Sequence, residues 1–233
     1  MPDPVSPATG WAVLHLFCRA GANGVDTEAV LSAVKVARGD EDTQVVSVAL
    51  LGHKADLGFM VLAPDLWRLR RFQSALQAAG LVVVDSYVSL TEVSEYAKGM
   101  PEEMKRPRLY PVLPPDGKPA FCFYPMSKRR ALGANWYELA FEDREELMRG
   151  HGATGRTFAG RILQLITGST GLDDYEWGVT LFGVHADDLK EVVYTMRYDE
   201  ASAKYAEFGP FYAGMVASVE DVLTATVGVH PDA

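Results

Sequence analysis

Residues 44–90 read QVVSVALLGHKADLGFMVLAPDLWRLRRFQSALQAAGLVVVDSYVSL, and this stretch decides the fold class. Three segments (44–51, 57–62 and 81–90) are rich in Val and Leu and have the composition of buried strands. Residues 64–79 begin with proline, which suits the first turn of a helix. Their apolar side chains recur at helical spacing, at Leu66, Leu69, Phe72 and Leu76. The stretch therefore predicts the order strand, strand, helix, strand.

The same order extends over the whole chain. A strand at 11–18 and a helix at 27–37 precede the stretch and complete a β-α-β-β-α-β unit. A second unit follows, with strands at 120–126, 161–167, 177–184 and 211–217 and helices at 142–150 and 186–208. Two such units predict an α+β fold of two ferredoxin-like halves. Because each half has one apolar sheet face to cover, we expect the two sheets to pack together into one barrel-like core.

Between the halves lies a segment of different character. Residues 94–118 contain five prolines, clustered charge and little periodicity, which is typical of a linker. We therefore expect an N-terminal ferredoxin-like half at 1–93, a linker at 94–118 and a C-terminal half at 119–233.

Composition excludes several classes of protein. The net charge of -9 argues against a nucleic-acid-binding surface. Cys18 and Cys122 both lie in apolar segments, which does not support a disulfide framework and favours a reducing compartment. Residues 1–10 lack the apolar core of a signal peptide, and no run of about 18 apolar residues suggests a membrane span. We expect a cytoplasmic protein.

Five histidines are candidate ligands. His15 and His185 lie in apolar strands, where a hydrogen-bonded role in the core or at its rim is expected. His53 follows a glycine in a turn, and His230 belongs to a solvated C-terminal tail. His151 has glycine on both sides at the end of the helix predicted at 142–150. It fits either a C-terminal cap, where the helix dipole favours it, or an axial haem ligand that a flat macrocycle can approach.

Tyr124 lies at the end of a strand beside a basic run that includes Lys128. The pair fits an ordinary strand end, or a phenol and a point charge facing an anionic ligand. Gln164 is an amide in an apolar strand, and a buried amide needs hydrogen-bond partners.

Other polar and aromatic residues allow two interpretations each. Arg106, Arg108 and Arg197 are surface charges or carboxylate partners, and Trp136 and Trp177 are core residues or pocket walls.

The second half resembles the coproheme decarboxylases of the chlorite dismutase superfamily. The resemblance rests on YPMSK at 124–128, NWY at 135–137, HGATGR at 151–156, QLITG at 164–168, GLDDYEWG at 171–178 and MRYDEASA at 196–203. RPRLYP at 106–111 also fits. The first half matches more loosely, chiefly through GHKADL at 52–57.

The resemblance implies a dimeric α+β barrel assembled into a homopentamer, with the haem pocket in the C-terminal half. His151 is then the iron ligand, Tyr124 the tyrosine that becomes a radical, with Lys128 beside it, and Gln164 the distal polar residue. The residues implied to contact the porphyrin are Arg108, Tyr124, Ser127, Lys128, Trp136, Gln164, Trp177, Arg197 and Ser202. A carboxylate such as Glu200 is one candidate partner for the other imidazole nitrogen of His151.

The implied reaction uses hydrogen peroxide to decarboxylate two propionates of iron coproporphyrin III (coproheme) and gives haem b. The substrate is then also the redox cofactor, and a ferrochelatase is a candidate contact. Three alternatives stay open. A chlorite dismutase uses a distal arginine where this chain has Gln164, and an uncharged amide does not hold an anion as a guanidinium does. A haem-binding or haem-transfer protein with weak peroxidase activity needs no Tyr124 beside Lys128. A non-haem barrel of the same fold is the third alternative, and His151, Gln164 and Arg197 together argue against it.

Overall fold

The N-terminal half forms one β-α-β-β-α-β unit in the computed structural model, which describes residues 2–97 and 99–227. Its elements are β1 (Ala12–Ala20), α1 (Thr27–Gly39), β2 (Gln44–Leu50), β3 (Leu57–Ala63), α2 (Leu66–Ala78) and β4 (Leu81–Thr91). Asp26 and Asp65 begin the two helices, because each carboxylate accepts a backbone N–H of the first turn. The predicted order is confirmed for this half. His230 lies outside the described residues.

The C-terminal half repeats this order with additions. Its elements are β5 (Ala120–Lys128), β6 (Arg130–Ala131), β7 (Ala134–Asn135), η2 (Trp136–Glu138), α4 (Phe141–Arg156), β8 (Ile162–Gly168), β9 (Trp177–Gly183), α5 (Ala186–Met196), α6 (Glu200–Ala203), β10 (Ala206–Phe208), β11 (Tyr212–Ala217) and α7 (Val219–Thr226). The segment between the halves contains η1 (Glu95–Ala97) and α3 (Glu102–Leu109).

The eight long strands form one closed sheet. Within each half the strands pair in the same antiparallel order, β4-β1-β3-β2 and β8-β9-β5-β11. The halves join edge to edge, through β2 with β11 and β4 with β8, and the pairing of β5 with β9 closes the barrel. The predicted fold of two ferredoxin-like halves that share one barrel-like core is therefore confirmed, and the halves share it because the free edges of their sheets pair. At the first join, a side chain at Gly214 would clash with the carbonyl oxygen of Ala49.

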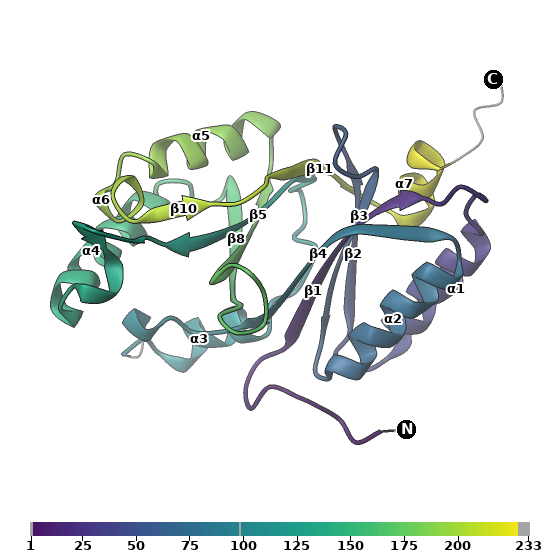
Figure 1. Cartoon of the computed structure of the whole chain (residues 1–233), viewed down its shortest axis with the longest axis horizontal. Coiled ribbons are helices and arrows are strands. Elements are labelled where there is room, and N and C mark those ends of the chain that lie inside the picture. Colours follow the sequence, from purple (N-terminus) through teal and green to yellow (C-terminus); the bar gives the residue numbers. More distant parts are fainter. Residues whose placement is uncertain (1, 98, 228–233) are drawn as a thin grey trace.

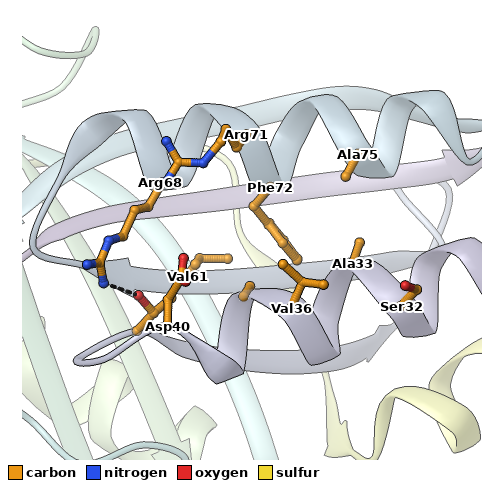
Figure 2. Close-up of a pocket in the computed structure, with 11 residues that line it drawn as sticks. Ser32, Ala33, Val36, Asp40, Val61, Arg68, Arg71, Phe72 and Ala75 are labelled. Carbon is orange, nitrogen blue, oxygen red and sulfur yellow. Dashed lines mark hydrogen bonds between the residues drawn. The ribbon is translucent and has the colours of Figure 1, made fainter. Parts of the chain in front are cut away.

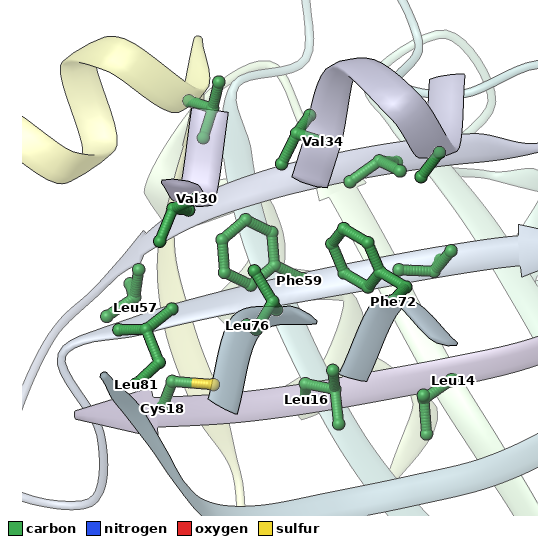
Figure 3. Close-up of a cluster of buried hydrophobic side chains, with 14 of the residues drawn as sticks. Leu14, Leu16, Cys18, Val30, Val34, Leu57, Phe59, Phe72, Leu76 and Leu81 are labelled. Carbon is green, nitrogen blue, oxygen red and sulfur yellow. The ribbon is translucent and has the colours of Figure 1, made fainter. Parts of the chain in front are cut away.

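Successive side chains along each strand point alternately into the barrel and away from it, which separates an inner core from two outer cores. On β1, Val13 and Phe17 point into the barrel, while Leu14 and Leu16 pack against the helices. Helices α1, α2 and α7 cover the outer face of the N-terminal half, and α4, α5 and α6 lie on the opposite side of the molecule (Figure 1). Figure 3 shows the outer core under α1 and α2, where Phe59 faces Phe72. A smaller outer core under α5 contains Tyr124.

His15 lies inside the barrel, as expected for a hydrogen-bonded core residue. Its Nε2 is 3.0 Å from Oγ1 of Thr180 on β9, and its ring stacks on Phe123 with centroids 4.2 Å apart. Only 1% of the residue is exposed, so its imidazole is kept neutral by its surroundings.

Acid is expected to destabilise the fold through His15. Burial lowers the pKa of His15 from 6.5 to about 3, so between these values the unfolded chain binds a proton that the folded chain does not. The contribution of the neutral imidazole is complete above the unfolded pKa and is lost as the pH falls, by about 2 kcal/mol at roughly pH 5. Urea unfolding across this range measures the effect. The His15→Leu variant is expected to show a smaller pH dependence, and an equal dependence in both proteins would contradict this account.

Three elements differ from the sequence-based predictions. Residues 102–109 form helix α3 although Pro107 lies inside it, so the segment at 94–118 is not irregular throughout. Helix α4 does not end near residue 150 but continues to Arg156, because its later turns pack against α6 and α5. The helix predicted at 186–208 breaks after Met196, and its last residues form β10, which pairs with the end of β5.

His185 also differs from its prediction. It follows β9 rather than lying within it, and its peptide N–H donates to Asp188 as α5 begins.

The surface of the N-terminal half carries a groove between α1 and α2. It has a volume of about 310 Å³ and is lined by residues that include Val36, Arg68 and Phe72. Figure 2 shows Arg68 at one end, where its guanidinium donates to Oγ1 of Thr43 over 3.2 Å. None of the helices in the described part of the chain combines the length and apolar character that a bilayer crossing needs.

Candidate functional site

His151 projects from α4 toward the short helix α6. Its Nδ1 is 2.9 Å from Oδ2 of Asp199, whose other oxygen accepts the N–H of Ala201 at the start of α6. The hydroxyl of Ser202 lies 3.5 Å from the same nitrogen. With Nδ1 donating to the carboxylate, Nε2 carries the lone pair that a metal needs. His151 is therefore inside a helix and oriented by a carboxylate, rather than being a cap at a helix end.

The partner of His151 is Asp199 and not Glu200, which was the candidate proposed from sequence. Asp199 is one-tenth exposed, and its position is fixed by its second role as the N-cap of α6. The sequence carries the signal for this role, since Asp before Glu-Ala-Ser is typical of a helix start. A carboxylate of this kind orients an imidazole ligand and strengthens it as an electron donor.

The Asp199→Asn variant is expected to hold the iron of haem, used as a probe, about 10–100-fold more weakly than the parent. The amide retains some capping capacity, but it removes the negative charge that orients the His151 ring. An absorption titration of the ligand-free protein measures the affinity. Glu200→Gln is the matched control, because it makes the same chemical change one residue away, and equal losses in both variants would contradict the role of Asp199.

Tyr124 lies on the outer face of β5, in the core beneath α5. Its ring stacks on Phe211, with centroids 4.5 Å apart, and meets the edge of Phe208 at 5.6 Å. Burial raises the pKa of Tyr124 above its usual value, and the neighbouring Cys122 raises it further, while Arg197 opposes both effects. The phenol is therefore held neutral in a nearly dry environment.

Lys128 ends β5 and is almost fully buried. Its Nζ donates to the carbonyl of Ala201 over 3.0 Å and lies 4.1 Å from the centroid of the Trp136 ring. Burial lowers the pKa of Lys128 to about 8, and the charges of Asp199 and Glu176 act against this shift. The backbone N–H of Lys128 donates to Glu176 over 2.7 Å. Lys128 thus contacts α6, the helix that carries Asp199 and Ser202.

Two features near this site are not evident from the sequence. Glu176 is buried and binds the backbone of Lys128. It lies within the 171–178 motif, but a single acidic residue at the start of a strand carries no distinctive pattern. The sequence-based prediction places Phe208 in a helix and Phe211 at a strand start, so it does not anticipate their contact with Tyr124.

Other predicted site residues lie along β5, β9 and the end of α5. The guanidinium of Arg197 lies 5.2 Å from the centroid of the Phe208 ring. Trp177 begins β9 and lies opposite Met126 on the neighbouring strand β5, and its indole N–H donates to Glu92 over 3.1 Å. The hydroxyl of Ser127 accepts the N–H of Glu176 over 3.2 Å.

Gln164 and Arg108 are placed differently from the rest. Gln164 is exposed on the outer face of β8, so the interpretation as a buried amide is wrong: the neighbouring Leu165, on the opposite face, packs into the barrel core instead. Ile166, two residues on, is 41% exposed on the same face. Arg108 is exposed on α3, where it donates to the carbonyl of Met104. Across residues 2–97 and 99–227, no hydrogen bond or ion pair joins Arg108 to the other site residues.

These residues suit a flat, anionic, iron-containing ligand better than a bare metal ion. No group of three or more His, Cys, Asp or Glu side chains able to hold a metal ion occurs within the described residues. A single imidazole backed by Asp199 is a donor set that fits an iron already held by a porphyrin. The exposed face around Ile166 offers apolar surface, and Arg197 and Lys128 offer positive charge for carboxylates.

Comparisons with known proteins identify relatives over nearly the whole chain. Residues 25–217 match the family described as Chlorite dismutase. A heme-binding protein from Thermus thermophilus is 36% identical, with a TM-score of 0.84 over 97% of this chain and 100% of that chain. The "Putative heme-binding protein" of Natronomonas pharaonis is 40% identical over 92% of this chain, which spans 40% of that protein's length. A variant of chlorite dismutase from Candidatus Nitrospira defluvii shares the fold, with a TM-score of 0.75 at 21% identity over 95% of this chain and 97% of that one. The chain belongs to the chlorite dismutase family.

Proposed function

We propose that this protein converts coproheme to haem b by decarboxylating two propionates with hydrogen peroxide. The observation that carries the proposal is that two groups, an imidazole and a phenol, lie outside the barrel in the C-terminal half, among its strands and covering helices. His151 is an imidazole held by Asp199 at 2.9 Å, and Tyr124 is a buried phenol with the cation Arg197 nearby. An iron ligand alone would explain haem binding, whereas a dry, neutral phenol beside a cation suits the oxidation of a carboxylate-bearing substrate.

The proposed reaction balances for each propionate. One side chain –CH2–CH2–COOH and one H2O2 give –CH=CH2, CO2 and two H2O. The propionate loses two electrons and the peroxide gains them, so two peroxides are required for each coproheme. Iron in the bound substrate activates the peroxide, and the protein supplies position, charge and proton control.

We assign His151 to the iron of the substrate through Nε2, with Asp199 fixing the ring. Tyr124 is assigned to the propionate that reacts. Because its surroundings disfavour the phenolate, Tyr124 gives up its electron and its proton together, and it recovers both as the propionate is oxidised. Arg197, exposed near the end of α5, is assigned to a propionate.

The ammonium of Lys128 has three donors. One is used by Ala201, and we assign another to a substrate carboxylate. Ser127, Trp136, Gln164, Trp177, Ser202 and Arg108 stay predicted porphyrin contacts. A homopentamer, a ferrochelatase contact and the boundaries at 93/94 and 118/119 also stay predictions.

The proposal is tested by adding coproheme and then hydrogen peroxide to the ligand-free protein. The mass of the porphyrin is measured afterwards. The expected product has lost two carboxyl groups. Tight binding without a change in mass would favour a haem-binding or haem-transfer role, which the names of the relatives from Thermus thermophilus and Natronomonas pharaonis support. Oxygen release from chlorite would favour a chlorite dismutase, although the resemblance implies an uncharged amide, Gln164, at the position of that activity's guanidinium.

A further inference from the structure

Tyr124, Phe208 and Phe211 form a cluster of three mutually contacting aromatic rings, which we call the aromatic cluster. Phe211 lies nearly parallel to Tyr124, at an angle of 22°, Phe208 meets Tyr124 at 66°, and the centroids of the two phenylalanines are 6.3 Å apart. The guanidinium of Arg197 lies over the face of Phe208. Such contacts fix the orientation of a ring more closely than aliphatic packing does, because aromatic pairs prefer defined geometries.

Phe208 is the last residue of β10, and Phe211 lies in the short connection from β10 to β11; both strands pair with β5, the strand of Tyr124. The N–H of Gly209, between them, donates to the carbonyl of Pro125 over 2.8 Å. A Cβ at Gly209 would lie 2.6 Å from the Tyr175 ring and 2.7 Å from Pro125. The backbone of the connection is therefore held against β5 by the bond from Gly209 to Pro125.

Lys54 also holds the connection, from the N-terminal half. Its Nζ donates to the carbonyl of Phe211 over 2.6 Å and lies 5.5 Å from the centroid of the Tyr212 ring. The turn that carries Lys54 is itself bound to β11, because the N–H of Leu51 donates to Ala213 over 2.9 Å. Lys54 belongs to the GHKADL segment at 52–57, for which the site described above provides no role.

We propose that Lys54 is a positioning residue for Tyr124, which it holds in place by fixing Phe211 against the phenol ring. This inference rests on the proposed role of Tyr124. A charge-assisted bond to the Phe211 carbonyl restrains the peptide from which that ring projects. With the ring in place, water is kept from one face of Tyr124, and the phenol keeps a single orientation toward its reaction partner. The N-terminal half thereby contributes to the chemistry of the C-terminal half.

The test places 3-fluorotyrosine at position 124 alone, in the full-length ligand-free protein, and follows its fluorine resonance by NMR. Lys54→Met removes the donor and keeps the stem, Lys54→Arg restores a donor, and Lys35→Met removes an exposed lysine on α1 as the matched control. In Lys54→Met we expect the resonance to move toward that of solvated fluorotyrosine and the pKa of the residue to fall. Lys54→Arg and Lys35→Met are expected to match the parent. The rate of coproheme conversion in Lys54→Met should fall on the order of tenfold, with unchanged substrate affinity.

An unchanged resonance and pKa in Lys54→Met would overturn the inference. If that variant does not fold, Phe211→Leu provides the same test, because it removes the stacked ring directly, and an unchanged resonance there would likewise overturn it. Failure of the proposed function gives a different result. In that case the parent would not convert coproheme, while the fluorine signal would still separate Lys54→Met from Lys35→Met and support the positioning role.

Discussion

Replacing His151 by glycine is expected to lower the affinity for coproheme and haem b by more than about 100-fold. This loss exceeds the one expected for Asp199→Asn, because His151 binds the iron itself in the proposed complex. The imidazole offers the iron a nitrogen lone pair at Nε2, since Asp199 occupies only Nδ1. Absorption titration of the ligand-free protein gives the affinity, and the position of the haem band reports the axial ligand.

Two controls separate ligation from folding in that experiment. His53→Ala removes an exposed histidine from the turn between β2 and β3 and should leave the titration unchanged. Free imidazole should restore the absorption band of the His151→Gly variant, because it replaces the missing side chain in the space that the substitution leaves. A His151→Gly variant that binds coproheme with the band and affinity of the parent would show that another residue holds the iron.

The Tyr124→Phe variant is expected to bind coproheme nearly as the parent does and to lose conversion by about 1000-fold or more. The substitution keeps the ring that packs against Phe208 and Phe211, so the packing beneath α5 is retained. It removes the O–H through which an electron and a proton leave together. Because the effect falls on the chemical step, the rate under single-turnover conditions should fall while the binding curve does not.

Mass analysis of the porphyrin over time after peroxide addition measures this loss. Tyr205→Phe provides a matched control, since Tyr205 is also buried but packs edge-on against Trp136 rather than in the aromatic cluster. Conversion by Tyr124→Phe at the rate of the parent would remove Tyr124 from the proposed chemistry and would leave only a packing role for the phenol ring.

The fold is predictable from the sequence to the level of element order and class. Long apolar segments such as 44–51 and 81–90 form β2 and β4 because burial on one or both faces requires their composition. Closure of the barrel is not predictable, since pairing of β2 with β11 and β4 with β8 depends on edges far apart in sequence. Helix α3 escapes prediction because Pro107 lies within it, and β10 does so because three residues are too few for a periodic signal.

In the candidate site, the sequence predicts only those residues that stand out by their own type and their immediate neighbours. His151 and Tyr124 stand out as an imidazole between glycines and a phenol before a basic run. Their partners do not stand out in this way, because contacts such as His151 with Asp199 join residues 48 apart in the chain. The exposed position of Gln164 is likewise set by which helices cover β8, a property of packing rather than of the strand's composition.

The proposed reaction uses one peroxide for each of two propionates. We would titrate the coproheme complex with measured equivalents of hydrogen peroxide and determine the porphyrin mass after each addition. We expect conversion to haem b to be complete at about two equivalents, as the balanced reaction requires. A porphyrin that keeps all four carboxyl groups, however much peroxide is consumed, would contradict it.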